Sequence, residues 1–189
     1  MIEELVKRNR SCRRFQQSHK ITVQTLRQLV NLARFGASAS NLQPLKYILS
    51  CERQRNELIF PHLGWAGYLK DWPGPAEGER PSAYIVILGD TTVSKTFNYD
   101  YGIAAQNILL GATEMGLAGC MIATIDKPNL AKALNISAAF EILLVVALGK
   151  PAEQIVIETV GAGGDIRYWR DEQGVHHVPK RVLDEIIIS

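Results

Sequence analysis

The segment Asp100-Tyr-Gly-Ile-Ala-Ala-Gln-Asn-Ile-Leu-Leu-Gly-Ala-Thr-Glu-Met115, with Gly116-Leu-Ala-Gly-Cys-Met-Ile-Ala-Thr-Ile125 directly after it, decides the fold of this 189-residue chain. Its first half predicts a helix, because apolar residues recur at helical spacing and a glycine is a typical helix stop. The second half predicts a buried strand over 119–125. The helix is rich in alanine and glycine, which allow another backbone to approach closely. We therefore expect it to be central, and a dimer interface is one place where it would fit.

The same patterns predict further helices and strands on both sides of this segment. A short helix should run from Ile2 to about Arg8, and a second helix should begin after Thr22 and end at Gly36. Its buried face should carry Val23, Leu26, Leu29, Val30 and Ala33. Strands are expected near 46–51, 83–89 and 141–149, with a short helix over 127–134 that Asp126 caps. Together these elements predict a mixed α/β (α+β) fold with one mixed or antiparallel sheet between helices.

Two segments lack the pattern of a packed element. Residues 61–81 hold four prolines and four glycines, which predicts a long loop or lid. Its aromatic residues Trp65, Tyr68 and Trp72 either cover a substrate or form the small core of the loop, and the sequence leaves both open. Residues 152–189 form a tail with no obvious core, containing a hairpin that turns at Gly174. Because this tail is apolar, we expect it to dock across a partner subunit.

Composition and charge limit the classes of function. With 47% hydrophobic and 21% charged residues, residues 1–189 should form one soluble globular domain. A net charge of +2 argues against nucleic acid or an anionic membrane as the main partner. Three cysteines without C-x-x-C spacing argue against a disulfide framework and a zinc site, so we expect a reducing cytoplasm. No apolar run reaches the roughly 18 residues of a membrane span, and the first residues do not resemble a signal peptide.

The segment Arg10-Ser11-Cys12-Arg13-Arg14-Phe15 is the first candidate binding motif. Guanidinium groups beside a hydroxyl suit a phosphate dianion, and clustered arginines repel one another unless an anion compensates them. Arg10, Ser11 and Arg13 are the candidate phosphate ligands. The alternative is a basic turn that is merely solvated.

The segment Ser38-Ala39-Ser40-Asn41-Leu42-Gln43-Pro44 is the second candidate motif, in the connection between a helix and a strand. The carboxamides of Asn41 and Gln43 donate and accept at once, so with Ser38 they could read the edge of a heterocycle. The alternative is that these residues only cap the loop. The two motifs together indicate a phosphorylated ring cofactor, and flavin mononucleotide (FMN) fits that description.

Both segments resemble signatures of the FMN-dependent nitroreductase family, which read roughly R-R-S-x-R-x-F and S-x-x-N-x-Q-P-W. The helix and strand over 100–125 resemble the family's A-x-Q-N-L-x-L-A-A helix, which a G-L-G step and a strand follow. Residues 178–183 resemble its basic ending. This chain departs from the patterns at Asn9, Leu45 and Ala118, which stand where the family has a basic residue, an aromatic residue and a glycine.

The resemblance implies a nitroreductase-like homodimer that shares two FMN sites, with each tail wrapped around the partner. NAD(P)H would reduce the flavin in a ping-pong cycle, and a nitroaromatic, a quinone or a related small molecule would then accept the electrons. No catalytic side chain is expected, because the flavin carries the chemistry. The implied cofactor-binding residues are Arg10, Ser11, Arg13, Ser38, Asn41, Gln43, Met121, Ala123 and Thr124, with Lys180 or Arg181 on the phosphate.

Other functions stay open at this point. One is a flavin enzyme of the same fold with different chemistry, such as dehalogenation or flavin fragmentation. Another is a non-enzymatic flavin carrier or sensor, and a third is a phosphate- or nucleotide-binding module without flavin. Cys120 is expected to be inert in a buried strand. His176 and His177 should point to opposite faces of a strand, so we expect no shared metal ion.

Overall fold

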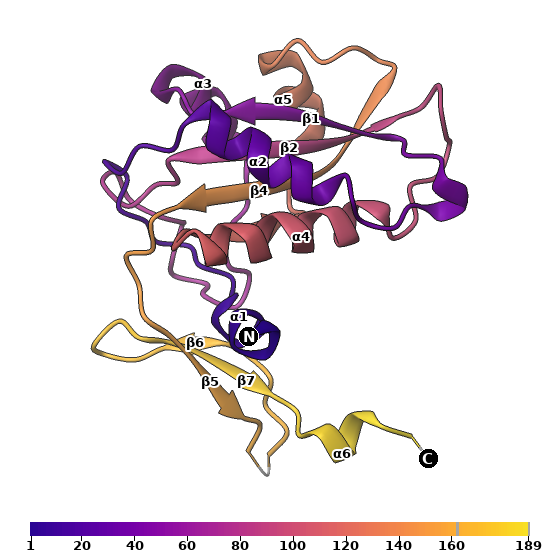
Figure 1. The fold of residues 1–189 in the computed structure, drawn as a ribbon. Coiled ribbons are helices and arrows are strands. Elements are labelled where there is room, and N and C mark those ends of the chain that lie inside the picture. Colours follow the sequence, from indigo (N-terminus) through magenta and orange to yellow (C-terminus); the bar gives the residue numbers. More distant parts are fainter. Residues whose placement is uncertain (162, 189) are drawn as a thin grey trace.

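The computed structural model describes residues 1–161 and 163–188. Its central sheet has four antiparallel strands in the order β1-β2-β4-β3 (Figure 1). The two middle strands are apolar along nearly their whole length, because both of their faces are covered. The strands are β1 (Leu45–Ser50), β2 (Ala83–Asp90), β3 (Ala118–Ile122) and β4 (Phe140–Gly149).

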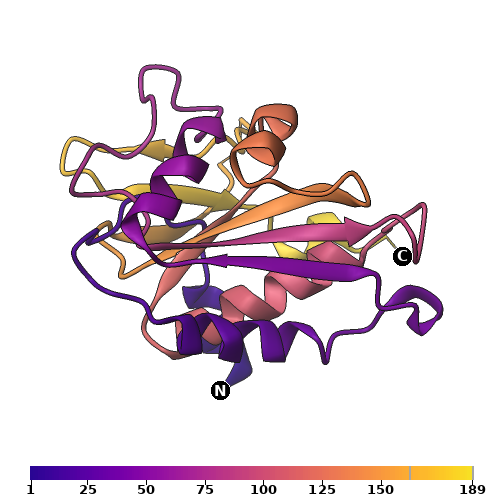
Figure 2. The same ribbon diagram turned by 90° about the horizontal axis from the view of Figure 1, so that it is seen from above.

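Helices cover both faces of this sheet, as Figure 2 shows. The helices α2 (Val23–Ala33) and α4 (Asp100–Glu114) pack on one face, and α3 (Arg53–Ile59) and α5 (Lys127–Ala133) pack on the other. Alternate residues of β2 point to opposite sides, so that Ile85 contributes to one core and Val86 to the other. The predicted mixed fold with one sheet between helices is therefore confirmed.

The predicted caps and small residues shape the helical layer. The Oγ1 atom of Thr22 accepts a hydrogen bond from the backbone N–H of Thr25 and caps α2. A Cβ atom at Gly111 of α4 would lie 2.3 Å from Leu32 Cδ1, so glycine at this position lets the leucine side chains of α2 pack close to α4. The predicted burial of Val23 is wrong, because this residue borders an open cavity of about 880 Å³ and is 55% exposed.

The connection between β1 and β2 contains more structure than the sequence predicts. The helix α3 was not expected, because Arg53-Gln-Arg-Asn-Glu-Leu-Ile59 has no apolar stripe, and the 3-10 helix η2 (Phe60–His62) follows it. The irregular loop then wraps Trp65 against Gly74, whose φ of +116° and close contact leave no room for a side chain. Trp65 thus belongs to the core of the loop.

The N-terminal helix and the tail form the lower part of Figure 1. A second sheet has the order β5-β7-β6, in which β5 pairs parallel to β7 and β6 pairs antiparallel to β7. The predicted hairpin at Gly174 is confirmed, with a φ of +79° at this glycine, whereas β5 was not predicted. The elements are α1 (Ile2–Arg8), β5 (Ile155–Thr159), β6 (Trp169–Arg170), β7 (His176–Lys180) and α6 (Leu183–Ile186).

No helix within residues 1–161 and 163–188 is long and apolar enough to span a bilayer.

Candidate active site

The arginine turn (residues 10–14) lies against the edge strand β3. Ser11 pairs with Gly119, and the backbone N–H of Cys12 donates to the Gly119 carbonyl at 3.0 Å. A Cβ atom at Gly119 would lie 2.3 Å from the Ala147 carbonyl oxygen, so only glycine fits at this crossing. The fold thus brings together two motifs that lie more than a hundred residues apart in the sequence.

Beyond Gly119, the edge of β3 presents backbone donors. The N–H and C=O groups of one residue point to the same side of a strand, and this side alternates along the chain. Because the Gly119 carbonyl faces the arginine turn, the N–H group of Met121 faces the same edge, and Ala123 directly follows the end of the strand. In the described part of the chain, no strand pairs with this edge. It therefore offers donors to a planar ligand that carries acceptors.

The 61–81 loop closes the far end of this edge. The Gly64 N–H donates to the Thr124 carbonyl at 2.8 Å, and Leu63 pairs with Ile125. These contacts end the predicted strand at Ile122 instead of 125.

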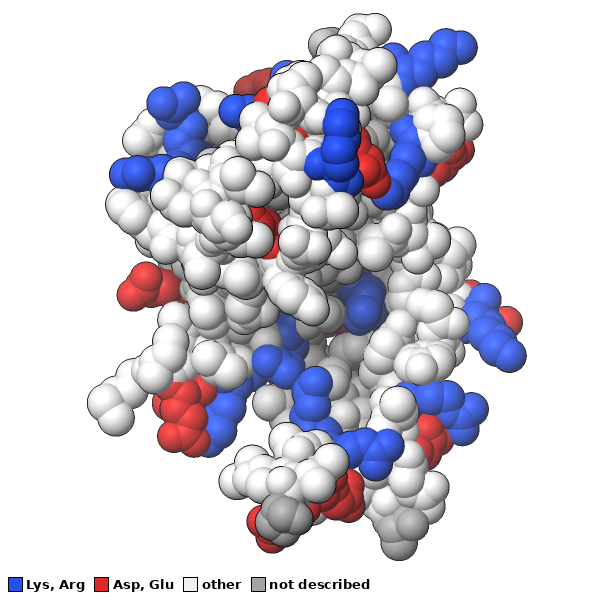
Figure 3. Space-filling view, turned by 90° about the vertical axis from the view of Figure 1, so that its right-hand side faces the viewer, with Lys and Arg blue, Asp and Glu red and all other residues white. Residues whose placement is uncertain are grey.

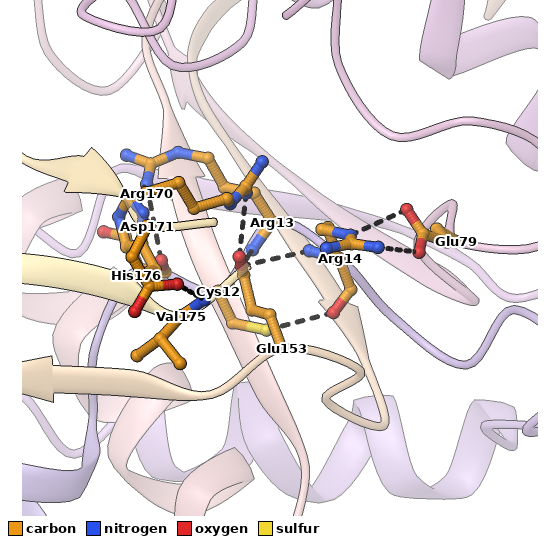
Figure 4. Close-up of polar contacts among 10 residues, drawn as sticks. Cys12, Arg13, Arg14, Glu79, Glu153, Arg170, Asp171, Val175 and His176 are labelled. Atoms are coloured by element: carbon orange, nitrogen blue, oxygen red, sulfur yellow. Dashed lines mark hydrogen bonds and ion pairs between the residues drawn. The ribbon is translucent and has the colours of Figure 1, made fainter. Parts of the chain in front are cut away.

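Two of the four arginines near the turn are neutralised by carboxylates (Figure 4). Arg14 donates two hydrogen bonds to Glu79, and these bonds hold the pKa of Glu79 below its ordinary value. Arg170 of β6 donates to Glu153 at 2.8 Å. The same carboxylate accepts hydrogen bonds from the backbone N–H groups of Arg13 and Arg14. Glu153 therefore ties the tail to the arginine turn.

The other two arginines keep their charge without a carboxylate partner among the described residues. Arg13 lies over the Tyr168 ring, 4.8 Å from its centre, and its Nη1 lies 3.4 Å from His176 Nε2. Arg10 donates to the Val6 carbonyl and lines a separate cavity of about 430 Å³, and its buried Nε has no partner in the described chain. On the face shown in Figure 3, lysines and arginines gather around a hollow in the lower half of the molecule.

The second motif is a strained loop at the start of α4. Ser38 donates to the Asp100 carboxylate at 2.5 Å and accepts from the Gln43 N–H, so its hydroxyl shapes the loop as the capping alternative predicts. Ser40, Asn41 and Gln43 have φ of 50°, 54° and 51°. Such backbone strain concentrates at binding sites. The side chains of Asn41 and Gln43 are exposed and hydrogen-bonded to each other.

The arginine turn and the Ser38–Gln43 loop lie at opposite ends of α4. Arg8, next to the arginine turn, donates to the Thr113 carbonyl in the last turn of the helix, whereas Ser38 contacts Asp100 in the first turn. The thirteen residue steps from Asp100 to Thr113 span about 20 Å of helix. One chain by itself therefore does not bring Asn41 and Gln43 to the arginine turn.

The basic pair at the end of β7 also lies away from the turn. Lys180 follows His176 by four residues, which is about 13 Å along a strand. Arg181 is exposed and lies 3.6 Å from the Glu185 carboxylate. The tail residues that contact the turn come instead from the segment before β5 and from the hairpin, and the sequence patterns did not single out Glu153, Tyr168 or Arg170.

The two histidines behave as the strand geometry predicts. His176 faces Arg13, whereas His177 contacts the carboxylates of Glu158 and Asp171 on the other face, which raises its pKa. Cys120 is buried, and burial raises the pKa of its thiol to about 12, as expected for an inert cysteine.

The 61–81 loop reaches the tail through its remaining aromatic residues. The rings of Tyr68 and Tyr168 lie 5.0 Å apart, and Arg170 lies over the Trp72 ring at 4.6 Å. The loop therefore meets the hairpin beside Arg13.

Comparison with known proteins separates the central sheet and its helices from the tail. A family model described as the nitroreductase family matches residues 6–67 and 82–150, which leaves out most of the loop and the whole tail. A comparison with curated proteins finds no match.

Solved structures share this fold at low sequence identity. A nitroreductase family protein from Streptococcus pneumoniae TIGR4 superposes with a TM-score of 0.71 and 18% identity over 100% of both chains. An FMN-dependent nitroreductase from Clostridium difficile R20291 has a TM-score of 0.64 and 18% identity over 82% of this chain and 89% of its own. A candidate NADH dehydrogenase/NAD(P)H nitroreductase from Parabacteroides distasonis ATCC 8503 has a TM-score of 0.64 and 23% identity over 79% and 86%.

Proposed function

Because this chain belongs to the nitroreductase family, we propose that it is an FMN-dependent oxidoreductase that uses NAD(P)H to reduce a small acceptor. The observation that carries the proposal is the unpaired edge of β3 beside the arginine turn. It offers backbone donors for a ring at one end and, at the other, the Arg13 guanidinium, which no described carboxylate neutralises. Nitroaromatics and quinones are the proposed class of acceptor. The neighbours described as FMN-dependent and as NAD(P)H nitroreductases support the choice of cofactor and donor.

The residues at this edge fit FMN. Bound FMN would accept and pass on hydride equivalents, which is chemistry that no side chain of the site supplies. Ser11 and Arg13 would hold its phosphate, since a hydroxyl and an unpaired guanidinium both donate to phosphate oxygens. The N–H groups of Met121 and Ala123 would hold the ring and favour negative charge there. Thr124 remains a proposed ring contact. Lys180 or Arg181, which lie away from the arginine turn of their own chain, would reach the phosphate of a partner's site through the tail.

A homodimer would complete this site. Asn41 and Gln43 belong to the loop at the opposite end of α4 from the arginine turn of their own chain, so we propose that a second copy supplies them. Large apolar side chains are exposed on α1, at the end of α2 and on α6, including Ile2, Phe35 and Leu183 at 65–68% exposure. Exposed large apolar side chains are candidates for an interface with another chain. The proposed tail across the partner would cover part of it.

We also place the protein in the cytoplasm. All three cysteines, Cys12, Cys51 and Cys120, are free in the structure. Free thiols persist in a reducing compartment.

The proposal is tested with an absorbance spectrum of the purified full-length protein after addition of FMN. We expect flavin bands that bleach under anaerobic NADPH or NADH and return when a quinone or nitroaromatic is added. Bands that persist with both nucleotides would indicate a flavin carrier instead of an enzyme. A protein that takes up no FMN would refute the proposal.

A further inference from the structure

Arg13 meets two aromatic side chains of the C-terminal hairpin. Its Cζ lies 4.8 Å from the centre of the Tyr168 ring, and its Nη1 lies 3.4 Å from His176 Nε2. The two rings also contact each other, with centroids 5.3 Å apart. We call Tyr168 and His176 the aromatic platform. Both residues lie outside the segments that the family model matches.

The platform holds Arg13 without neutralising it. A carboxylate in the same place would cancel the charge that a phosphate ligand needs, as Glu79 does for Arg14. A ring face attracts a guanidinium through its quadrupole and leaves the charge unchanged. His176 is 1% exposed, and burial lowers its pKa to about 4, so its ring is neutral at neutral pH. Because a guanidinium can only donate, the contact with Arg13 requires the tautomer in which Nε2 accepts.

A separate contact fixes the platform relative to the arginine turn. The Glu153 side chain is fully buried and accepts from the backbone N–H groups of Arg13 and Arg14, at 2.5 and 3.1 Å, and from Arg170. Figure 4 shows this carboxylate between the turn and the hairpin. Because Arg170 lies between Tyr168 and His176 in the sequence, Glu153 connects the backbone of Arg13 to the hairpin that carries both rings.

We propose that the aromatic platform is a positioning element that aims Arg13 at the phosphate of bound FMN. The proposal rests on the flavin function proposed above. FMN affinity then depends on two side chains of the tail hairpin, Tyr168 and His176, that do not themselves contact the phosphate. The platform also links the phosphate end of the site to the 61–81 loop, because Tyr68 packs on Tyr168.

Riboflavin is FMN without its phosphate. Its binding therefore distinguishes a variant that misplaces Arg13 relative to the phosphate from a variant that no longer folds. The test measures the affinity of cofactor-free, full-length protein for FMN and for riboflavin by flavin fluorescence quenching. Tyr168→Leu and His176→Phe remove the ring face and the acceptor nitrogen, and Tyr168→Phe and His176→Gln restore one each. Trp169→Leu is the matched control, because Trp169 lies on the same hairpin but stacks on His177, on the other face.

We expect Tyr168→Leu and His176→Phe each to weaken FMN binding about three- to tenfold, the size of one cation–π contact or hydrogen bond. Riboflavin binding should not change, and the two conservative variants and Trp169→Leu should bind FMN like the wild type. If Tyr168→Leu or His176→Phe weakens FMN and riboflavin binding equally, or weakens neither, the proposed role of the aromatic platform is refuted. Tyr168 is only half-buried, so its pair decides the question even if His176→Phe does not fold. A wild type that binds neither flavin overturns the proposed function as well.

Discussion

Replacing Glu153 with alanine should destabilise the protein far more than replacing Glu79, although both carboxylates contact the arginine turn. The Glu153 side chain is 0% exposed, and it accepts two backbone N–H groups and the guanidinium of Arg170, which is 15% exposed. Its removal leaves these donors without an acceptor. Removing one partner of a buried ion pair costs about 3–5 kcal/mol, which is a large share of the stability of an ordinary domain.

The Glu79 carboxylate gives the matched control. It is 31% exposed and pairs with Arg14, whose side chain is 30% exposed, so water replaces much of the lost interaction. We expect Glu79→Ala to cost about 1 kcal/mol or less, as for other solvent-accessible pairs.

The free energy of unfolding is measured from urea titrations followed by tryptophan fluorescence. The protein concentration is held constant, because association would shift the midpoint. Glu153→Gln keeps an acceptor for the backbone amides but loses the charge, so its cost should lie between the other two. If Glu153→Ala unfolds at the same urea concentration as Glu79→Ala, the buried carboxylate does not hold the tail on the turn.

Three further outcomes are expected. Arg13→Ala should weaken FMN binding by one to two orders of magnitude, about 1.5–3 kcal/mol for a charged hydrogen bond, and an unchanged affinity in an equilibrium titration would contradict the phosphate assignment. Truncation after Pro151 should give an unstable or monomeric protein, so a folded dimer in sedimentation would argue against a tail that covers a partner. The folded-state pKa of His176 is about 4, below its ordinary value of 6.5, so its contribution to stability is present above pH 6.5 and is lost as the pH falls toward 4. The loss in the free energy of unfolding reaches about 3 kcal/mol. His176→Gln should lose less stability than the wild type between pH 7 and 4.5, and equal losses would contradict this assignment. His177, whose pKa is raised, acts in the opposite direction in both proteins.

Elements with a strong local signal were predictable from the sequence. The stripe and cap of α2, the small-residue face of α4 and the apolar runs of β2 and β4 each contain their own periodicity. The helix α3 lacks such a stripe, and β5 depends on pairing with β7, about twenty residues later in the chain. Because neither element has a local sequence pattern, neither could be predicted.

The residue types of the candidate site were also predictable, because phosphate and heterocycles require specific donors. Arginine beside a hydroxyl and paired carboxamides are such donors wherever they stand in the fold. Their partners were not predictable. Nothing near Arg13 in the sequence indicates that its guanidinium rests on Tyr168, whereas Arg14 is neutralised by Glu79.

The sequence by itself determined the helices and strands with a strong local pattern, most of their buried faces and the chemistry available to the site, since all three follow from local spacing and side-chain type. Only the tertiary structure decided which of these groups meet. It set the arginine turn on the edge of β3, placed the Ser38–Gln43 loop at the other end of α4, and brought the hairpin to Arg13. Contacts between distant segments depend on how whole layers pack, and a local pattern carries no information about that packing.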